Sequence, residues 1–256
     1  MKVGICTSVD QIQTMEEMGF DFIEPAVVSI VGMAESEYKE ALAKAKDASI
    51  SCEVFNILFT GDIKLVRPEL NLDKLREYLK GAFDKIAPFG PKIVVFGSGF
   101  ARRVPDGVSF EDGWRDLVEA ARVVGEVASQ YDITIAMESL NKKESNILNS
   151  VSEGMKFVNE VNHPNIRLLA DFYHMRMENE PVDVIEQLTP DILVHAHIAR
   201  GNDRYFPLKA DEDIYSEFFQ SLKEIGYKGR ISIEGGTDDV RRDGPIALEL
   251  LRKLSS

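Results

Sequence analysis

Eight short apolar runs recur along the chain, each separated from the next by a longer stretch, and this alternation constrains the fold more than any other feature. Most of the runs are dense in Val, Ile, Leu and Phe, as expected of strands covered on both faces. In chain order they are KVGIC (2–6), FDFIE (20–24), ISCEVF (50–55), KIVVFG (92–97), ITIAME (133–138), IRLLAD (166–171), ILVHAHI (192–198) and ISIEGG (231–236).

The stretches between the runs contain strong helix formers and apolar residues at helical spacing. Helices are expected over 37–48, 71–90, 109–131, 150–161, 211–227 and 238–256. Strands that alternate with helices predict an α/β fold, a parallel sheet closed into a (β/α)₈ TIM barrel, as a single domain over residues 1–256. A doubly wound open sheet is disfavoured, because no G-x-G-x-x-G motif follows the first run.

Composition limits the setting in which the protein works. The net charge of −13 would repel nucleic acid phosphates over much of the surface. The two cysteines form neither a disulfide framework nor a zinc-finger spacing, which favours a reducing compartment. No apolar stretch is long enough for a signal peptide or a membrane span. We therefore expect a cytoplasmic protein with no nucleic acid and no membrane among its partners.

Four consecutive predicted strands, the fifth to the eighth, finish in side chains that can bind a metal ion. These are Glu138, Asp171, His197 and Glu234. In barrels of this kind, catalytic residues lie at the C-terminal ends of the strands. Each of the four follows an apolar run, where an unpaired charge is costly. Three carboxylates that converge there would repel one another unless a cation lay among them.

The donor set indicates which cation fits. One imidazole with three carboxylates is rich in oxygen and suits Mn²⁺, Mg²⁺ or Co²⁺. The set does not resemble a thiolate-rich zinc site. Taken singly, a carboxylate at a strand end is more often a helix N-cap or an ion-pair partner, and a lone histidine is usually structural. Recurrence on four successive strands favours the metal site.

Three other residues near the strand ends have ordinary alternatives. Glu24 either faces the site or forms a salt bridge inside the barrel mouth. His195 is expected to point away from the face that His197 uses, as a structural residue. Arg102 lies in the loop GSGFARRVPDG (97–107), which is expected to cover the site; it could meet a phosphate, but a solvated loop position is the default.

The segments AMESLNKKESN, NHPNIRLLADFYHM, VHAHIARGNDR and GYKGRISIEGG together resemble motifs of the xylose isomerase-like TIM-barrel family of sugar phosphate isomerases and epimerases. Within that family, the D-tagatose or D-psicose 3-epimerases fit best. The resemblance covers nearly the whole chain. It implies a sugar substrate, a divalent metal and a homo-oligomer, dimer or tetramer; Mn²⁺ is the expected ion, with Mg²⁺, Co²⁺ or Zn²⁺ as alternatives.

The resemblance also implies roles for individual residues. The metal ligands fall on Glu138, Asp171, His197 and Glu234. The two glutamates among them would also act as the catalytic acid/base pair. Substrate-binding positions fall on Glu144, His174 and Arg204, and Arg200 is a nearby alternative to the last of these.

The implied reaction is epimerisation of a small ketose at C3 through a cis-enediolate. The ketose would chelate the metal through its C2 carbonyl and C3 hydroxyl, and the metal would stabilise the enediolate that forms when C3 loses its proton. Glu138 and Glu234 would flank the sugar, one removing the proton and the other returning it to the opposite face. His174 would hydrogen-bond the carbonyl oxygen, and Glu144 would orient the terminal hydroxyls.

Other activities remain open at this point. The same enediolate chemistry would serve an aldose–ketose isomerase of the hydroxypyruvate type or an inosose dehydratase-like lyase. An endonuclease IV-like DNA repair hydrolase needs a three-zinc cluster, more histidines and a basic surface, whereas this chain has four histidines and is acidic. A metal-free binding or scaffold barrel does not explain the ligand set.

Overall fold

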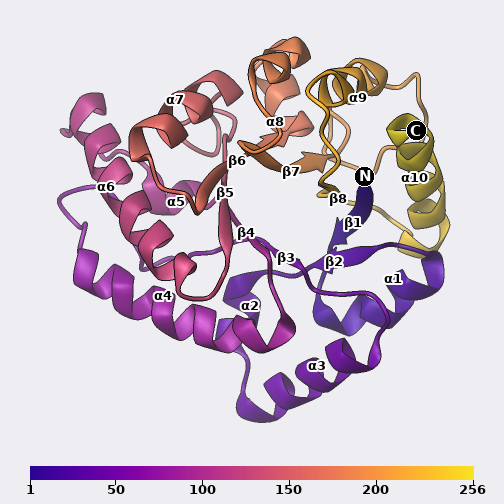
Figure 1. The fold of residues 1–256 in the computed structure, drawn as a ribbon, viewed down its shortest axis with the longest axis horizontal. Helices are drawn as coiled ribbons and strands as arrows, with labels where there is room; N and C mark the ends of the chain where they lie inside the picture. The colour runs from indigo at the N-terminus through magenta and orange to yellow at the C-terminus, as the bar shows by residue number, and fades with distance from the viewer.

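Eight strands surround a common axis with the helices outside them, in a computed structural model that describes residues 1–256 (Figure 1). The strands are β1 (Lys2–Cys6), β2 (Phe22–Glu24), β3 (Val54–Phe55), β4 (Ile93–Phe96), β5 (Thr134–Glu138), β6 (Ile166–Asp171), β7 (Leu193–Ile198) and β8 (Arg230–Ile233). Each overlaps one of the eight predicted runs, so the expected number and order of strands are confirmed.

The strands pair side by side in the order β2-β1-β8-β7-β6-β5-β4-β3, and every pairing is parallel. The two end strands of this sheet meet through isolated bridges rather than a regular ladder. There the backbone N–H of Ile23 donates to Ser51 O at 3.0 Å, and that of Asn56 donates to Pro25 O at 3.0 Å. These contacts bring the ring nearly to closure and confirm the predicted TIM barrel.

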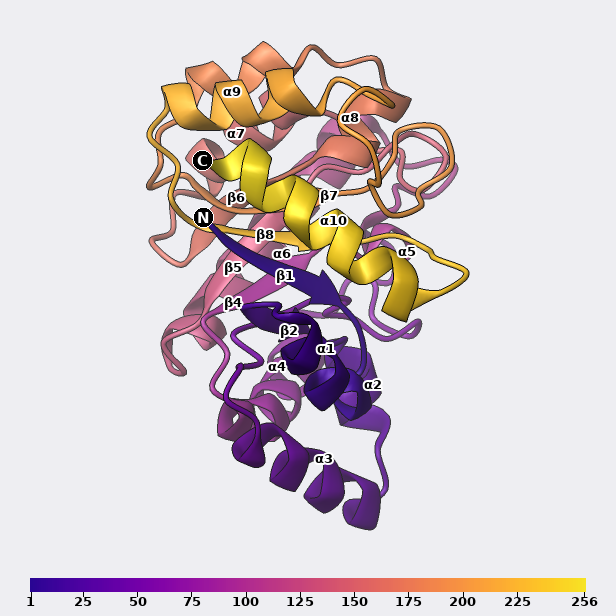
Figure 2. The same ribbon diagram turned by 90° about the vertical axis from the view of Figure 1, so that its right-hand side faces the viewer.

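The helices cover the outside of the barrel (Figures 1 and 2). They are α1 (Ile12–Met18), α2 (Val27–Gly32), α3 (Glu35–Asp47), α4 (Leu72–Ile86), α5 (Gly99–Arg102), α6 (Phe110–Ser129), α7 (Val151–Val161), α8 (Phe172–Met177), α9 (Tyr215–Glu224) and α10 (Val240–Ser255). Short 3₁₀ turns add η1 (Val9–Gln11), η2 (Ala87–Phe89) and η3 (Val182–Gln187). The long helices match the six predicted ranges, whereas α1, α2, α5 and α8 were not predicted. None of the ten combines the length and the apolar composition of a membrane span.

The barrel interior is layered. A small apolar cluster, formed by Phe22, Val54, Ile93, Val95, Ala136 and Leu169, comes from five strands, β2 to β6, and lies inside the barrel. Gly4 is required beside it, because a Cβ there would lie 2.4 Å from the Phe22 ring. The much larger apolar cluster contains most of the residues that pack the helices against the strands.

Residues two apart on a strand face the same side, so the next inward positions form a ring above the central cluster. This ring, here called the mouth, consists of Cys6, Glu24, Asn56, Gly97, Glu138, Asp171, His197 and Glu234. At the opposite end, Lys2, Glu53 and Arg230 form an ion-paired group, here called the floor. The fold thus places the C-terminal ends of all eight strands around one opening.

Candidate metal centre and active site

The four predicted metal ligands converge in the mouth. Glu138 ends β5, Asp171 ends β6, His197 lies in β7, and Glu234 follows β8. Each offers a ligand atom within 4.8 Å of the others. From Nδ1 of His197, the nearest carboxylate oxygens are 3.1 Å away on Glu138, 3.5 Å on Glu234 and 3.8 Å on Asp171. Side chains from four strands therefore meet at one point.

Local structure holds two of these carboxylates in place. Oδ1 of Asp171 accepts the backbone N–H of His174 at 3.1 Å, so this residue is also the N-cap of α8. Asp171 is therefore a helix N-cap, as strand-end carboxylates often are, and also a member of the cluster. Gly97 backs Glu138, because a Cβ at Gly97 would lie 1.8 Å from the Glu138 Oε2 atom. Any other residue at Gly97 would displace that carboxylate.

Burial and mutual repulsion separate the pKa values of the three carboxylates. Burial, and then the charge of Glu234, raise the pKa of Glu138. The same causes in the same order raise the pKa of Asp171 to about 6. Burial also opposes ionisation of Glu234, but His197 and Arg204 outweigh it and lower its pKa to about 2. The cluster therefore carries more negative charge than its own cationic partners balance.

These residues fit a divalent metal ion. Three carboxylates and one imidazole nitrogen face a common point. The pKa values of Glu138 and Asp171 are raised, so a nearby cation would favour the ionised form of both. The set is mostly oxygen with a single nitrogen, which suits Mn²⁺, Mg²⁺ or a similar ion.

Glu24 fixes the orientation of His197, the histidine among the predicted metal ligands. Its Oε1 lies 2.9 Å from Nε2 of His197, and its Oε2 lies 2.9 Å from Nε2 of His195. All three side chains are fully buried. With Nε2–H donating to Glu24, Nδ1 of His197 faces the carboxylates. Burial disfavours the charged ring, but Glu24 and Glu234 outweigh it and raise the pKa of His197, so a metal ion would bind Nδ1 by displacing its proton.

This arrangement corrects the expectation for His195. Residues 195 and 197 are two apart on one strand, so they share a face, and their ring centroids are 4.9 Å apart. His195 also lies 3.3 Å from the Ser232 hydroxyl. It is a structural neighbour, as expected, but it lies inside the barrel beneath His197 and shares Glu24 with it. The periodicity of two, applied correctly, would have found the pair.

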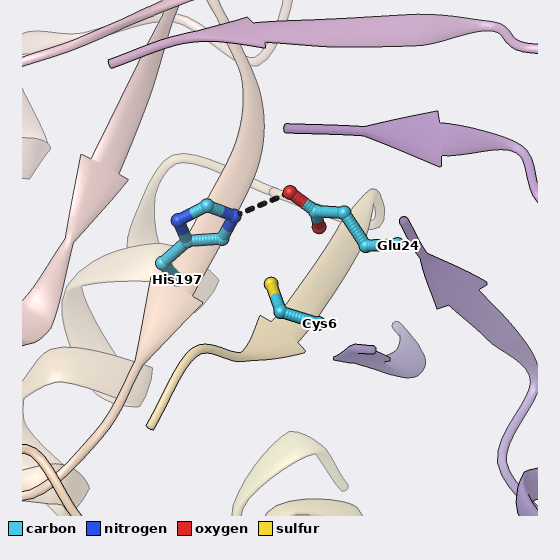
Figure 3. Close-up of side chains that lie close together, drawn as sticks. All are labelled: Cys6, Glu24 and His197. Atoms are coloured by element: carbon cyan, nitrogen blue, oxygen red, sulfur yellow. Dashed lines mark hydrogen bonds and ion pairs between the residues drawn. The ribbon is translucent and has the colours of Figure 1, made fainter. Parts of the chain in front are cut away.

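A second cluster adjoins the first and uses the other side of the same imidazole. Figure 3 shows the Cys6, Glu24 and His197 side chains turned toward one another, with the bond between Glu24 and His197 dashed. Their ligand atoms also lie within 4.8 Å of one another. Burial, and then the charge of Glu24, raise the pKa of the Cys6 thiol well above its usual range. A raised thiol pKa opposes the thiolate that a metal would need, so the four-residue cluster is the better metal centre.

His174 presents a free hydrogen-bond donor inside the protein. Its Nδ1 accepts the backbone N–H of Asn141 at 3.1 Å, and the Asn141 side-chain nitrogen lies 2.9 Å away. Burial lowers the pKa of His174 and so favours the neutral ring. A neutral ring that accepts at Nδ1 carries its proton on Nε2, and this buried atom has no partner in the protein. It lies 3.9 Å from Oδ2 of Asp171, at the edge of the metal cluster.

The remaining predicted substrate residues lie at the outer edge of the site. Arg204 donates to Oε2 of Glu234 at 2.6 Å and to Oε1 of Glu144 at 3.2 Å, and its guanidinium lies over the Tyr173 ring. Burial disfavours its charge, but Glu234 and Asp171 outweigh this and raise its pKa further.

The alternative arginine, Arg200, points elsewhere. Its guanidinium pairs with Asp203, at 2.8 Å between Nη2 and Oδ2, and lies over the Tyr205 ring. Arg204 is therefore the arginine that reaches the cluster.

Arg102 departs from the expected solvated position. Its side chain is fully buried, and its Nη1 donates to the backbone oxygen of Glu138 at 2.7 Å. Burial lowers the pKa of Arg102 to about 10, against the opposing charge of Glu138. The guanidinium thus supports the strand end that carries Glu138, and only its neighbour Arg103 is exposed.

A cavity of about 400 Å³ opens beside the metal cluster. Its walls include Glu138, Glu144, Arg204 and Glu234, together with residues 97–100. This volume lies in the range of about 300–1,000 Å³ usual for small-molecule sites. The site is therefore a pocket at the C-terminal face, and its lining includes four of the predicted site residues.

Several curated proteins are similar to this chain. A 3-dehydro-D-guloside 4-epimerase from Escherichia coli (strain K12) is 26% identical over 233 residues, covering 89% of this chain and 86% of the relative. A ketose 3-epimerase from Arthrobacter globiformis is 25% identical over 248 residues, covering 95% and 81%. An L-ribulose 3-epimerase from Methylomonas sp. (strain DH-1) is 32% identical over 123 residues, covering 48% of this chain and 42% of the relative.

Solved structures show the same fold. A crystal structure of a D-psicose 3-epimerase in the presence of D-fructose superposes with a TM-score of 0.88 at 21% identity, covering 100% of this chain and 99% of that one. The apo form of a 3-keto-D-glucoside 4-epimerase from E. coli gives a TM-score of 0.80 at 22% identity, covering 99% of each chain.

A family model described as "Xylose isomerase-like TIM barrel" matches residues 12–254. This range contains β2 to β8 and all the side chains of the four-residue cluster. The chain belongs to the xylose isomerase-like TIM-barrel family.

Proposed function

We propose that this protein is a divalent-metal-dependent epimerase of a small ketose, which inverts C3 by removing and returning the C3 proton. Glu138, Asp171, His197 and Glu234 would hold the metal. The observation that carries the proposal is the convergence of two glutamates from different strands with the unpartnered Nε2–H of His174. The ketose 3-epimerases among the similar proteins support it.

Glu138 and Glu234 are suited to opposite halves of the proton transfer. Each is a carboxylate that lines the pocket, so one can take a proton from the sugar while the other supplies one. Inversion needs two such groups, because a single base would return the proton to the face it left. In the reverse direction the two exchange roles.

The other residues orient the sugar and balance its charge. The Nε2–H of His174 would donate to the carbonyl oxygen, where negative charge develops as the proton leaves. Arg204 would keep the base ionised and hold Glu144 beside the sugar hydroxyls. When bound, the divalent cation supplies Lewis-acid stabilisation of that same oxygen charge.

Four further properties belong to the proposal. We expect Mn²⁺, which the oxygen-rich donor set accommodates together with Mg²⁺ and Co²⁺. The chain would act as one barrel domain, work in the cytoplasm and assemble as a homo-oligomer, as its relationship to the ketose epimerases suggests. Metal analysis of the purified protein tests the choice of ion, and its mass in solution tests the oligomeric state.

A second candidate is epimerisation at C4 of a sugar whose carbonyl is at C3. The E. coli relative that aligns over 89% of this chain is named as a 4-epimerase of such a sugar. The chemistry is the same, because in both reactions the proton leaves a carbon next to a ketone.

Deuterium exchange in D₂O, followed by NMR, tests the proposal. The protein loaded with Mn²⁺ is incubated with D-fructose, D-tagatose and a 3-keto-glycoside. Deuterium at C3 of a ketose together with its epimer is the expected result, and exchange at C4 of the 3-keto-glycoside would support the second candidate instead. Exchange at C1 or C2 alone, or loss of water, would contradict both.

A further inference from the structure

A second cavity of about 320 Å³ adjoins the one beside the metal cluster. The two share Asn56, Ile57 and Glu234 as lining residues. The first cavity alone is large enough for a small ligand. The second, here called the outer lobe, extends the site toward β1 and α2, past Thr7 and Ser29. The site is thus longer than one small-molecule cavity.

Asn56 faces this junction with an unused amide. The residue is only 6% exposed, and its backbone N–H and C=O bond to Pro25 and Val27. Its side-chain amide has no partner within the protein. The hydroxyls of Thr7 and Ser29 in the outer lobe are likewise free of protein hydrogen bonds. The amide is reached by solvent through the two cavities that it lines, so it is available to bond a polar ligand in place of water.

Ile57 stands between the two cavities in a strained conformation. Its φ of 45° lies in the left-handed region, which β-branched residues rarely occupy. Its side chain is 44% exposed although it is large and apolar. Strain of this kind concentrates at binding sites. An exposed apolar side chain beside an unused amide suits the face of a sugar ring, which combines C–H groups with hydroxyls.

The charge of the outer lobe excludes one class of ligand. Its lining contains two carboxylates, Glu24 and Glu234, and no lysine or arginine. A phosphate at the remote end of the sugar would find no lysine or arginine in this lining to pair with. A neutral group rich in hydroxyls fits both the free polar groups and the sign of the charge.

We propose that the outer lobe is a subsite for a second sugar unit, so that the substrate is a ketose glycosylated at the end remote from its carbonyl. This inference rests on the proposed epimerase function. The reacting carbons would lie between Glu138 and Glu234, the chain of the ketose would pass Asn56 and Ile57, and the second ring would lie against Thr7 and Ser29.

The experiment compares D-fructose with isomaltulose, in which a glucose is attached to O6 of fructose. C3 exchange in D₂O gives kcat/KM for each with the Mn²⁺-loaded protein. We expect the ratio of isomaltulose to fructose to exceed ten. Ser29→Trp, at the exposed rim, should lower this ratio at least tenfold by filling the outer lobe, whereas Ser36→Trp, on the exposed surface of α3, should leave it unchanged.

A second pair of variants avoids added bulk. Thr7→Val and Ser29→Ala each remove one hydroxyl, and each should lower the ratio by about twofold to tenfold, as expected for one hydrogen bond. A wild-type ratio below one, or a ratio that all three outer-lobe variants leave unchanged, would overturn the inference while the epimerase proposal stands. Absence of C3 exchange with isomaltulose, D-fructose and D-tagatose alike would overturn the epimerase proposal itself.

Discussion

The mouth and the floor of the barrel both bury charged side chains, but only the floor balances its charge. On the floor, Glu53 accepts from Lys2 Nζ at 2.6 Å and from Arg230 Nε at 2.8 Å. Burial opposes its ionisation, yet these two cations outweigh it and lower its pKa. In the mouth, Glu138 and Asp171 have raised pKa values, because burial and Glu234 act in the same direction.

The contrast separates stability from function. The floor is an ion-paired group that is complete within the chain and needs nothing from solution. The mouth concentrates carboxylates that are unfavourable without a proton or a cation, as expected where groups are arranged for binding and catalysis. Substitutions at the two ends should therefore have opposite signatures: loss of activity at the mouth and loss of stability at the floor.

The largest difference is expected in turnover. Glu234→Gln should lower kcat by about 10²–10⁴-fold, because the amide cannot accept the C3 proton. Steady-state kinetics with the substrate identified by the exchange experiment measure this. Glu53→Gln is the matched control and should retain kcat within about twofold. Near-normal turnover by Glu234→Gln would remove the two-carboxylate mechanism.

The next effect is on metal affinity. Glu24→Gln keeps the size of the side chain but weakens the hold on His197 Nε2, so Mn²⁺ affinity should fall by about 10–100-fold. Titration followed by the EPR signal of free Mn²⁺ measures it. Glu53→Gln again serves as the control. An unchanged affinity in Glu24→Gln would show that packing alone orients His197.

A smaller effect is expected on stability at the floor. Glu53→Gln leaves Arg230 without its charged partner and should lower the free energy of unfolding by about 1–2 kcal/mol. This is a discounted figure, because Lys2 is largely exposed. Urea denaturation of the metal-free protein at pH 7 measures it.

The same substitution has a pH dependence with a definite sign. The folded-state pKa of Glu53 is lowered, so its stabilisation is fully present above the unfolded value of about 4.3 and is lost as pH falls through the folded value. The difference in the free energy of unfolding between wild type and Glu53→Gln should be constant from neutral pH down to about pH 5 and should become smaller below it. A gap that widened in acid would contradict the ion-pair account.

The smallest effect is a gain of stability in the mouth. In metal-free protein, Asp171→Asn should raise the free energy of unfolding by about 1 kcal/mol at pH 8, because ionised Asp171 is unfavourable there. Asparagine also caps helices well, so α8 keeps its cap. The pKa of Asp171 is raised to about 6, so its cost is present above that pH and vanishes below about 4. Saturating Mn²⁺ should make wild type more stable than Asp171→Asn, because the ion binds wild type more tightly and so raises its free energy of unfolding more.

Much of this architecture could be predicted from sequence because the signals were local. Each strand is a dense apolar run, and the four residues of the candidate metal centre are polar groups at the ends of four such runs. Helices with several turns carry a periodic pattern, whereas α2 and α5 are too short to show one.

Other features depended on contacts that no local pattern contains. Arg102 is buried because the Glu138 carbonyl and the surrounding loop enclose it, although its sequence neighbours indicate a solvated loop. The free donor of His174 exists because Asn141, from a different loop, occupies the other ring nitrogen. The pairing of His195 with Glu24 was readable in principle, and the expectation failed because residues two apart were assigned to opposite faces.

The metal cluster and the outer lobe come from different parts of the chain, which can change independently. The metal cluster comes from β5 to β8, whereas the outer lobe is built mainly from residues before position 58. Substitutions in the first quarter of the chain could therefore retune which sugar is accepted while the proton-transfer groups stay intact. Such a barrel can therefore acquire new substrates through changes in the residues that bind the sugar, while the proton-transfer residues stay the same.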